Sequence, residues 1–240
     1  MSDRRRLERL TRLVALGAGH RSFSGWAGVV CQVVVDQVDV DGAAVVVRSW
    51  GRIEEQVAVS DRWVSDLEDL QYMVGEGPGV DAFAGGGPVL VSDLATSRDR
   101  WPGFTDTAHS AVRAVFSFPL QEGAIRLGTL TLYRRRPGPL SADGLADAAV
   151  LADLATTALL TDSGDVTGDP EDVAPWARQD APGHYDDVNV ASGMLAAQLQ
   201  ISIEDAFLRL RAHAFSHGRP VLDVARAVLE RRLGADTFAD

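Results

Sequence analysis

The sequence contains no lysine, and all 23 of its basic residues are arginine. A Walker A loop ends in Gly-Lys-Ser/Thr, so this absence excludes P-loop nucleotide hydrolysis. It also excludes kinase chemistry that depends on a strand lysine. Asparagine is almost as scarce, with Asn189 the single example. Because lysine and asparagine codons are AT-rich, the composition indicates a GC-rich source genome.

Other absences narrow the function further. A single cysteine, Cys31, cannot form an internal disulfide. The sequence has no HExxH motif, no nucleophile elbow and no His-rich metal spacing, so we expect a non-enzyme without a metal site or a resident cofactor. Apolar runs fall short of the roughly 20 residues of a membrane helix. The Arg-rich start lacks the apolar region of a secretory signal, so we expect a cytoplasmic protein without a membrane partner.

The composition that remains is that of a soluble globular protein. The chain has 240 residues, 46% apolar and 24% charged, with a net charge of -11. This length suits one large domain, or a mid-sized domain with a small partner.

The first two thirds of the chain predict an α+β domain over residues 1–161. Apolar spacing predicts an N-terminal helix on Leu7, Leu10, Leu13 and Val14 and a second over Trp26–Val35. Residues rich in β-branched side chains predict strands, and capping residues predict further helices. The strands are expected at Ala43–Arg48 and Ile53–Val59 around the turn Trp50-Gly51-Arg52, then at Val89–Val91, Ala114–Leu120 and Ile125–Tyr133. The further helices are expected after Asp61, at Val80–Ala84, within Ser97–Ser110, and from Ser141 to about Leu160. The order predicts an antiparallel sheet with helices closing one face.

The glycine-rich stretch Val74–Asp81, VGEGPGVD, resembles a phosphate-binding loop only superficially. Gly75, Gly77 and Gly79 do not follow the dinucleotide spacing, and Pro78 stands where a helix should begin. The stretch predicts a tight turn with unusual backbone angles.

Residues 162–183 are acidic and rich in Gly and Pro, which predicts a linker that contains Trp176. Beyond it, residues 184–240 predict a three-helix bundle. Its first helix covers Tyr185–Leu199, its second begins with a capping box at Ser202, and Gly218 and Pro220 separate the second from the third. At 100° per residue, Ile203, Phe207, Leu210 and Ala214 lie on one face of the second helix and are expected to form its core. In the third, Val221, Ala225 and Val228 face inward and Arg226 outward.

Three stretches of the first domain resemble the GAF domain of actinobacterial GAF-ANTAR regulators. They are LQYMVGEGPGVDAFAGGGPVLVSDL at Leu70–Leu94, Arg100-Trp101-Pro102, and VFSFPLQEGAIRLGTLTLY. The C-terminal stretch Ala191–Leu233 is similar to the ANTAR domain. The matching positions are Ala191, Gly193, Leu195, Ile201, Ser202, Glu204, Asp205, Ala206, Leu210, Arg211, Ala214, Leu222, Asp223, Val224, Ala225 and Val228.

This resemblance implies an RNA-binding antiterminator. ANTAR proteins bind paired hairpins in a nascent transcript, act as homodimers, and affect RNA polymerase only indirectly, by stabilising the transcript against a terminator. The residues that the resemblance and their chemistry favour for RNA contact are Arg209, Arg211, His213, Arg219, Arg226, Arg231, Arg232, Ala191, Gly193 and Met194. The family often has a lysine at Ser192 and a methionine at Ala196, so the binding surface is expected to shift toward the second and third helices. From His184 onward six arginines face eight acidic residues, so the domain lacks a net basic charge.

The GAF resemblance leaves the signal open. The cyclic-nucleotide signature needs Asn and Lys, and the methionine sulfoxide reductases of this fold need several cysteines, so both activities are disfavoured. Bilin attachment at Cys31 is disfavoured as well, and haem bound through His109 stays an alternative. The aromatic residues Phe83, Trp101, Phe104 and Phe116 suggest a pocket for an unknown small ligand. The alternative is that they are core and that the domain serves as a dimerisation platform.

Two other functions remain open. A three-helix bundle can form a DNA-binding helix-turn-helix, although the third helix offers mainly Arg226 and Glu230 outward, which are few base-reading side chains. The bundle could also mediate protein contacts alone.

Overall fold

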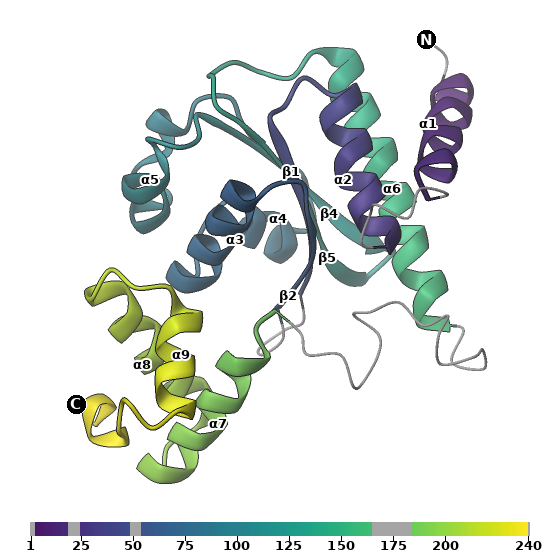
Figure 1. Ribbon diagram of the computed structural model, residues 1–240. Helices are drawn as coiled ribbons and strands as arrows, with labels where there is room; N and C mark the ends of the chain where they lie inside the picture. Colours follow the sequence, from purple (N-terminus) through teal and green to yellow (C-terminus); the bar gives the residue numbers. More distant parts are fainter. Residues whose placement is uncertain (1–2, 19–24, 49–53, 165–183, 240) are drawn as a thin grey trace.

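The computed structural model describes residues 3–18, 25–48, 54–164 and 184–239 (Figure 1). In these ranges the helices and strands are α1 (Asp3–Ala18), α2 (Gly25–Gln37), β1 (Gly42–Arg48), β2 (Glu54–Val59), α3 (Arg62–Val74), α4 (Pro78–Gly85), β3 (Val89–Val91), η1 (Leu94–Ser97), α5 (Pro102–Ala108), β4 (Ala114–Glu122), β5 (Ile125–Arg134), α6 (Ala142–Gly164), α7 (Asp186–Leu199), α8 (Ile203–Ser216), α9 (Val221–Leu229) and η3 (Ala235–Phe238). The predicted turn Trp50-Gly51-Arg52, Trp176 and most of the predicted linker lie outside the described residues.

The sheet is antiparallel, with strand order β2-β1-β5-β4-β3. Its central strand is β5, which pairs with β1 from Gly42 opposite Tyr133 to Val47 opposite Gly128. Each predicted strand is present, with its bounds within two residues of those expected. The α+β prediction for this domain is therefore confirmed.

Helices cover both faces of the sheet, which corrects the expectation that they close only one. Figure 1 shows α1, α2 and α6 on one side and α3, α4 and α5 on the other. The strand residues alternate accordingly. Phe116 and Leu132 join the core under α2 and α6, whereas Val115 and Tyr133 join the core under α3 and α5. Successive strand residues point to opposite faces, so nearly continuous apolar strands indicate a sheet buried on both sides.

The predicted helix cap at Asp61 and the predicted glycine turn are both present. The Asp61 carboxylate accepts a hydrogen bond from the Trp63 backbone N–H at 3.3 Å and caps α3. The glycine-rich stretch forms a tight turn between α3 and α4, with φ of 71° at Gly75 and 142° at Gly77. Residues that carry a side chain rarely adopt these backbone angles. A Cβ on Gly77 would also collide with the Gln71 side chain.

Helix α6 runs to Gly164, three residues into the segment assigned to the linker. Its residues Ala142–Thr161 are long and apolar enough to pass as a membrane span by composition, contrary to the expectation that no such run exists. However, 44% of that window is buried inside the protein. Ala148, Leu151 and Ala155 pack in the core against α2 and the sheet, as in the core helix of a soluble domain.

The C-terminal helices α7, α8 and α9 form a bundle around a further core cluster. The Ser202 hydroxyl accepts from the Asp205 N–H at 3.0 Å, so the predicted cap of α8 is confirmed. The buried stripe of α8 is Ala206, Leu210 and Ala214, while Ile203 is 39% exposed, and its assignment to the core was wrong. Ile203 is the first residue of the helix. It lies at the edge of the buried stripe, which Ala206, Leu210 and Ala214 form at four-residue spacing.

Candidate nucleic-acid interface

The most accessible arginines of the bundle lie at the end of α9. Arg226 pairs with Asp187 of α7, with 2.9 Å from Nε to Oδ2, and Arg232 pairs with Glu230 at 2.6 Å. Their side chains remain more than half exposed. Arg231 follows the helix, is exposed, and has φ of 58°. Arg226, Arg231 and Arg232, here called the α9 arginines, form the accessible part of the predicted set.

Arg209 has a structural partner. Its Nη1 donates to the backbone carbonyl of Phe238 at 2.5 Å and so ties η3 to α8. The guanidinium is half-buried, and this contact uses part of its hydrogen-bonding capacity.

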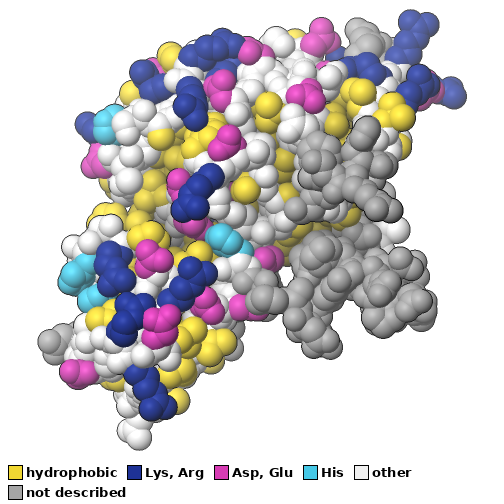
Figure 2. All heavy atoms as spheres, viewed as in Figure 1, with side chains coloured by type: hydrophobic (Ala, Val, Ile, Leu, Met, Phe, Trp, Pro, Cys, Tyr) yellow, Lys and Arg dark blue, Asp and Glu magenta, His cyan; other side chains and the backbone are white. Residues whose placement is uncertain are grey.

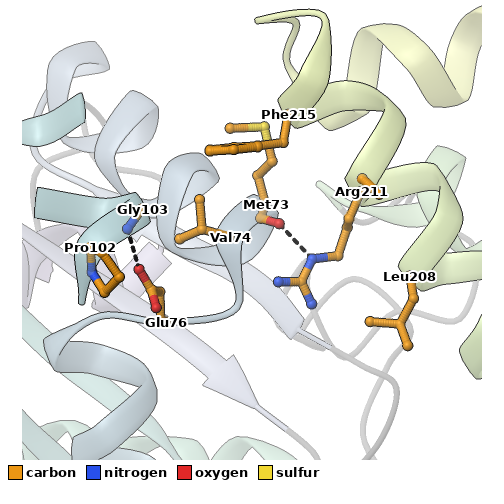
Figure 3. Close-up of a pocket in the computed structure, with 9 residues that line it drawn as sticks. Met73, Val74, Glu76, Pro102, Gly103, Leu208, Arg211 and Phe215 are labelled. Atoms are coloured by element: carbon orange, nitrogen blue, oxygen red, sulfur yellow. Dashed lines mark hydrogen bonds between the residues drawn. The ribbon is translucent and has the colours of Figure 1, made fainter. Parts of the chain in front are cut away.

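Arg211 is directed toward the N-terminal domain of the chain. Its Nε donates to the Met73 carbonyl at the C-terminal end of α3, at 2.5 Å (Figure 3). Its guanidinium carbon also lies 5.3 Å from the Phe207 ring centroid. A helix C-terminus carries partial negative charge and unpaired carbonyls, which favour a cation there. In this arrangement Arg211 joins the two domains, a role that the sequence did not indicate.

His213 and His217 stack on α8 with ring centroids 4.0 Å apart. Burial, with His217 and Arg219 nearby, holds the pKa of His213 below its usual 6.5. Neutral imidazole is therefore favoured near pH 7, and it suits stacking on a base or hydrogen bonding better than pairing with a phosphate. Arg219 is half-buried in the turn between α8 and α9.

The three predicted positions on α7 differ in access. Ala191 is fully buried in the bundle core, so its methyl group cannot reach RNA, and its place among the contact residues is corrected. Gly193 and Met194 are partly exposed. Ser192, where the family often has lysine, is buried and donates to the Val188 carbonyl at 2.7 Å.

Charges of both signs alternate over the bundle. Figure 2 shows arginine and acidic side chains interspersed on its visible face rather than one basic field. This arrangement agrees with the count of six arginines against eight acids from His184 onward. Any RNA contact must therefore rest on a few well-placed arginines.

Helix α3 of the N-terminal domain contributes to the core of the bundle. Tyr72 stacks on Tyr185, with centroids 3.8 Å apart and planes at 22°. The Tyr185 hydroxyl donates to Asp69 at 2.7 Å, and the His184 Nε2 lies 2.9 Å from the same oxygen. The sequence does not indicate this contact, because Tyr72 on α3 and Tyr185 at the start of α7 could each have packed within their own domain.

The predicted aromatic pocket does not exist as one cavity. Trp101 and Phe104 pack in the core under α3 and α5, whereas Phe116 faces α2 and α6 on the other side of the sheet. Phe83 is buried on α4. His109, the residue of the haem alternative, is exposed, and its Nδ1 contacts the Asp106 carbonyl at 2.9 Å.

Comparisons with known proteins agree with this architecture. The GAF domain family model matches residues 27–159, and the ANTAR domain model matches residues 179–229. A search of curated proteins finds no match. Among solved structures, the GAF domain from an Acinetobacter phosphoenolpyruvate-protein phosphotransferase is 15% identical, with a TM-score of 0.50 over 69% of this chain and 99% of that one. The corresponding Coxiella burnetii domain is 12% identical, with a TM-score of 0.48 over 66% of this chain and 93% of that one.

GAF and ANTAR domains are regulatory rather than catalytic, and they make this chain an RNA-binding antitermination regulator with a sensor module. The chain belongs to the GAF domain family and joins its GAF domain to a C-terminal ANTAR domain.

Proposed function

We propose that this chain, as a cytoplasmic homodimer of the actinobacterial GAF-ANTAR type, binds paired hairpins in nascent transcripts and prevents termination. RNA polymerase is affected only indirectly, through the transcript. The observation that carries the proposal is the group of α9 arginines on a domain of the ANTAR family.

The ion pairs of these arginines are suited to exchange. Arg226 with Asp187 and Arg232 with Glu230 are solvent-exposed pairs, which contribute about 0–1 kcal/mol. A phosphate can replace the carboxylate at small cost, because guanidinium binds phosphate in a bidentate manner. Arginine also stacks on unpaired loop bases. A small number of arginine contacts therefore suits recognition of a hairpin loop.

Dimerisation has a candidate surface on the first helical layer. Leu7 and Leu16 on α1 are 45% and 62% exposed, and Leu145 on the adjacent α6 is 36% exposed. At 100° per residue, Leu7 and Leu16 lie on opposite sides of α1, so each is a separate candidate contact for a second copy. Mass measurement of the wild type and of the single variants Leu7→Asp and Leu16→Asp tests the two contacts, and an unchanged mass in both variants would reject dimerisation through this layer.

The test of function is transcription in vitro. A template encoding two hairpins before an intrinsic terminator should give more read-through when the protein is present. A template whose hairpin loops are substituted should not respond. Equal read-through from both templates would refute hairpin-dependent antitermination.

A further inference from the structure

A cleft of about 450 Å³ separates the two domains beside the Arg211 contact. One wall is formed by α3 together with α5 and the turn after it, and the other by the end of α8 and the turn Gly218-Arg219-Pro220. A smaller cavity of about 430 Å³ adjoins it and shares Met73 and Phe215 (Figure 3). Clefts of this volume at domain boundaries are typical of small-molecule sites.

The walls of the cleft are mainly apolar. Leu67, Leu70 and Met73 come from α3 and Ala108 from α5. Phe215 of α8 enters from the opposite side and is 52% exposed. An exposed phenylalanine within an apolar cleft favours an apolar occupant, since covering it removes apolar surface from water.

The two walls also carry opposite charges. Asp66 of α3 lines one wall and Arg219 of the α8–α9 turn lines the other. In the part of the chain that the structure describes, neither side chain has a salt bridge or side-chain hydrogen bond. Asp69, which also lines the cleft, already receives hydrogen bonds from His184 and Tyr185.

We propose that this cleft binds an α-amino acid with an apolar side chain. Asp66 would receive the ammonium group, Arg219 the carboxylate, and the surface around Phe215 and Leu70 the side chain. A molecule with one group of each sign matches a carboxylate and a guanidinium on facing walls better than a simple cation or anion, which would leave one charge unmatched.

The position of the site has a consequence for the domains. Because one ligand group contacts α3 and the other contacts the bundle, occupancy stabilises the arrangement in which Arg211 binds the Met73 carbonyl. The site goes beyond the proposed RNA function and does not depend on it, so binding is measured without RNA.

The experiment uses the full chain with phenylalanine, leucine, isoleucine, valine, methionine and tryptophan as probes, at concentrations up to about 10 mM. At least one should raise the thermal midpoint, by an amount that grows with its concentration. Asp66→Asn and Arg219→Gln should each weaken the binding of that amino acid about 10-fold. Asp99→Asn, an exposed carboxylate outside the cleft, should leave it unchanged.

Two analogues separate the roles of the charges. Phenethylamine, which lacks the carboxylate, should respond to Asp66→Asn and not to Arg219→Gln, and 3-phenylpropionate should show the reverse. Both variants change exposed or half-exposed residues, so we expect both to fold. Absence of stabilisation by every amino acid probe would overturn the proposal, and so would binding that neither variant weakens.

Discussion

The Glu68 side chain extends from α3 toward the sheet and has no exposed surface. The Tyr133 hydroxyl donates to its Oε1 at 2.8 Å, the Gln71 amide donates to its Oε2 at 3.3 Å, and Arg48 lies 3.6 Å away. Burial raises the pKa of Glu68, and the Arg48 charge and the Tyr133 hydrogen bond oppose that rise only in part. Burial of a charged group costs free energy unless it is paired and hydrogen-bonded, which explains this network.

We predict that Glu68 makes stability fall as pH rises. Because its folded pKa lies above the usual 4.5, the folded state holds the proton more tightly than the unfolded chain does. The contribution of Glu68 is therefore most favourable at or below about pH 4.5 and declines as pH rises through the raised pKa. Urea unfolding of wild type and Glu68→Gln across this range should give a difference in unfolding free energy that shifts in favour of the variant as pH rises. Parallel curves would contradict the assignment.

Gln200 ends α7 in the left-handed conformation, with φ of 56° and ψ of 42°. A non-glycine residue costs about 1 kcal/mol there, so Gln200→Gly should raise the unfolding free energy by about that amount. Gln198→Gly, two residues earlier on the exposed face of the same helix, should lower it by about 1 kcal/mol. Denaturant titration of the two variants checks the opposite signs, and a loss of stability in both would refute this role for Gln200.

At the scale of helices and strands, the sequence indicated most of what the structure contains. The strands, the Asp61 and Ser202 caps, and the glycine turn at Gly75 follow from local chemistry, which a single sequence displays. The side of the sheet on which each helix packs depends on contacts between residues distant in sequence. The sequence therefore did not predict that helices cover the second face.

The same limit applies to the candidate site. That Arg226 faces outward followed from helical periodicity, and the structure agrees. Arg211 contacts Met73, 138 residues away in the chain, and no local pattern reports such a contact. The separation of Phe116 from Trp101 likewise depends on the register of β4 within the whole sheet.

Helix α1 is held to α6 by a buried ion pair, and we predict that this pair is essential to its docking. The Arg6 Nε lies 2.7 Å from Asp147, and both side chains are below 10% exposure. Arg6→Ala leaves Asp147 with only its half-exposed partner Arg9 and should destabilise the chain by about 3 kcal/mol. Arg4→Ala removes an exposed pair with Glu8 and should cost less than about 0.5 kcal/mol. Equal losses in urea unfolding would contradict the assignment.

For the whole molecule, the contact between α3 and the bundle should make the two domains unfold together. Tyr72 is 6% exposed and packs on both Tyr185 and Phe207. Tyr72→Ala should remove this contact and split the calorimetric transition in two, with the bundle melting first. Val190→Ala, at a 55% exposed position of α7, should leave a single transition. A single transition in Tyr72→Ala as well would show that the contact does not couple the domains.

The central claim is that the bundle binds RNA through the α9 arginines. Its most direct test is the equilibrium affinity of the full chain for a two-hairpin RNA at several salt concentrations, with duplex DNA as competitor. Replacing Arg226, Arg231 and Arg232 together by alanine should weaken binding at least about 10-fold and flatten the log–log salt slope by about 2. The control replaces Arg4, Arg5 and Arg12 on α1, which changes the net charge equally and should retain wild-type affinity. Equal affinity in the two triple variants, or preference for duplex DNA, would contradict the account.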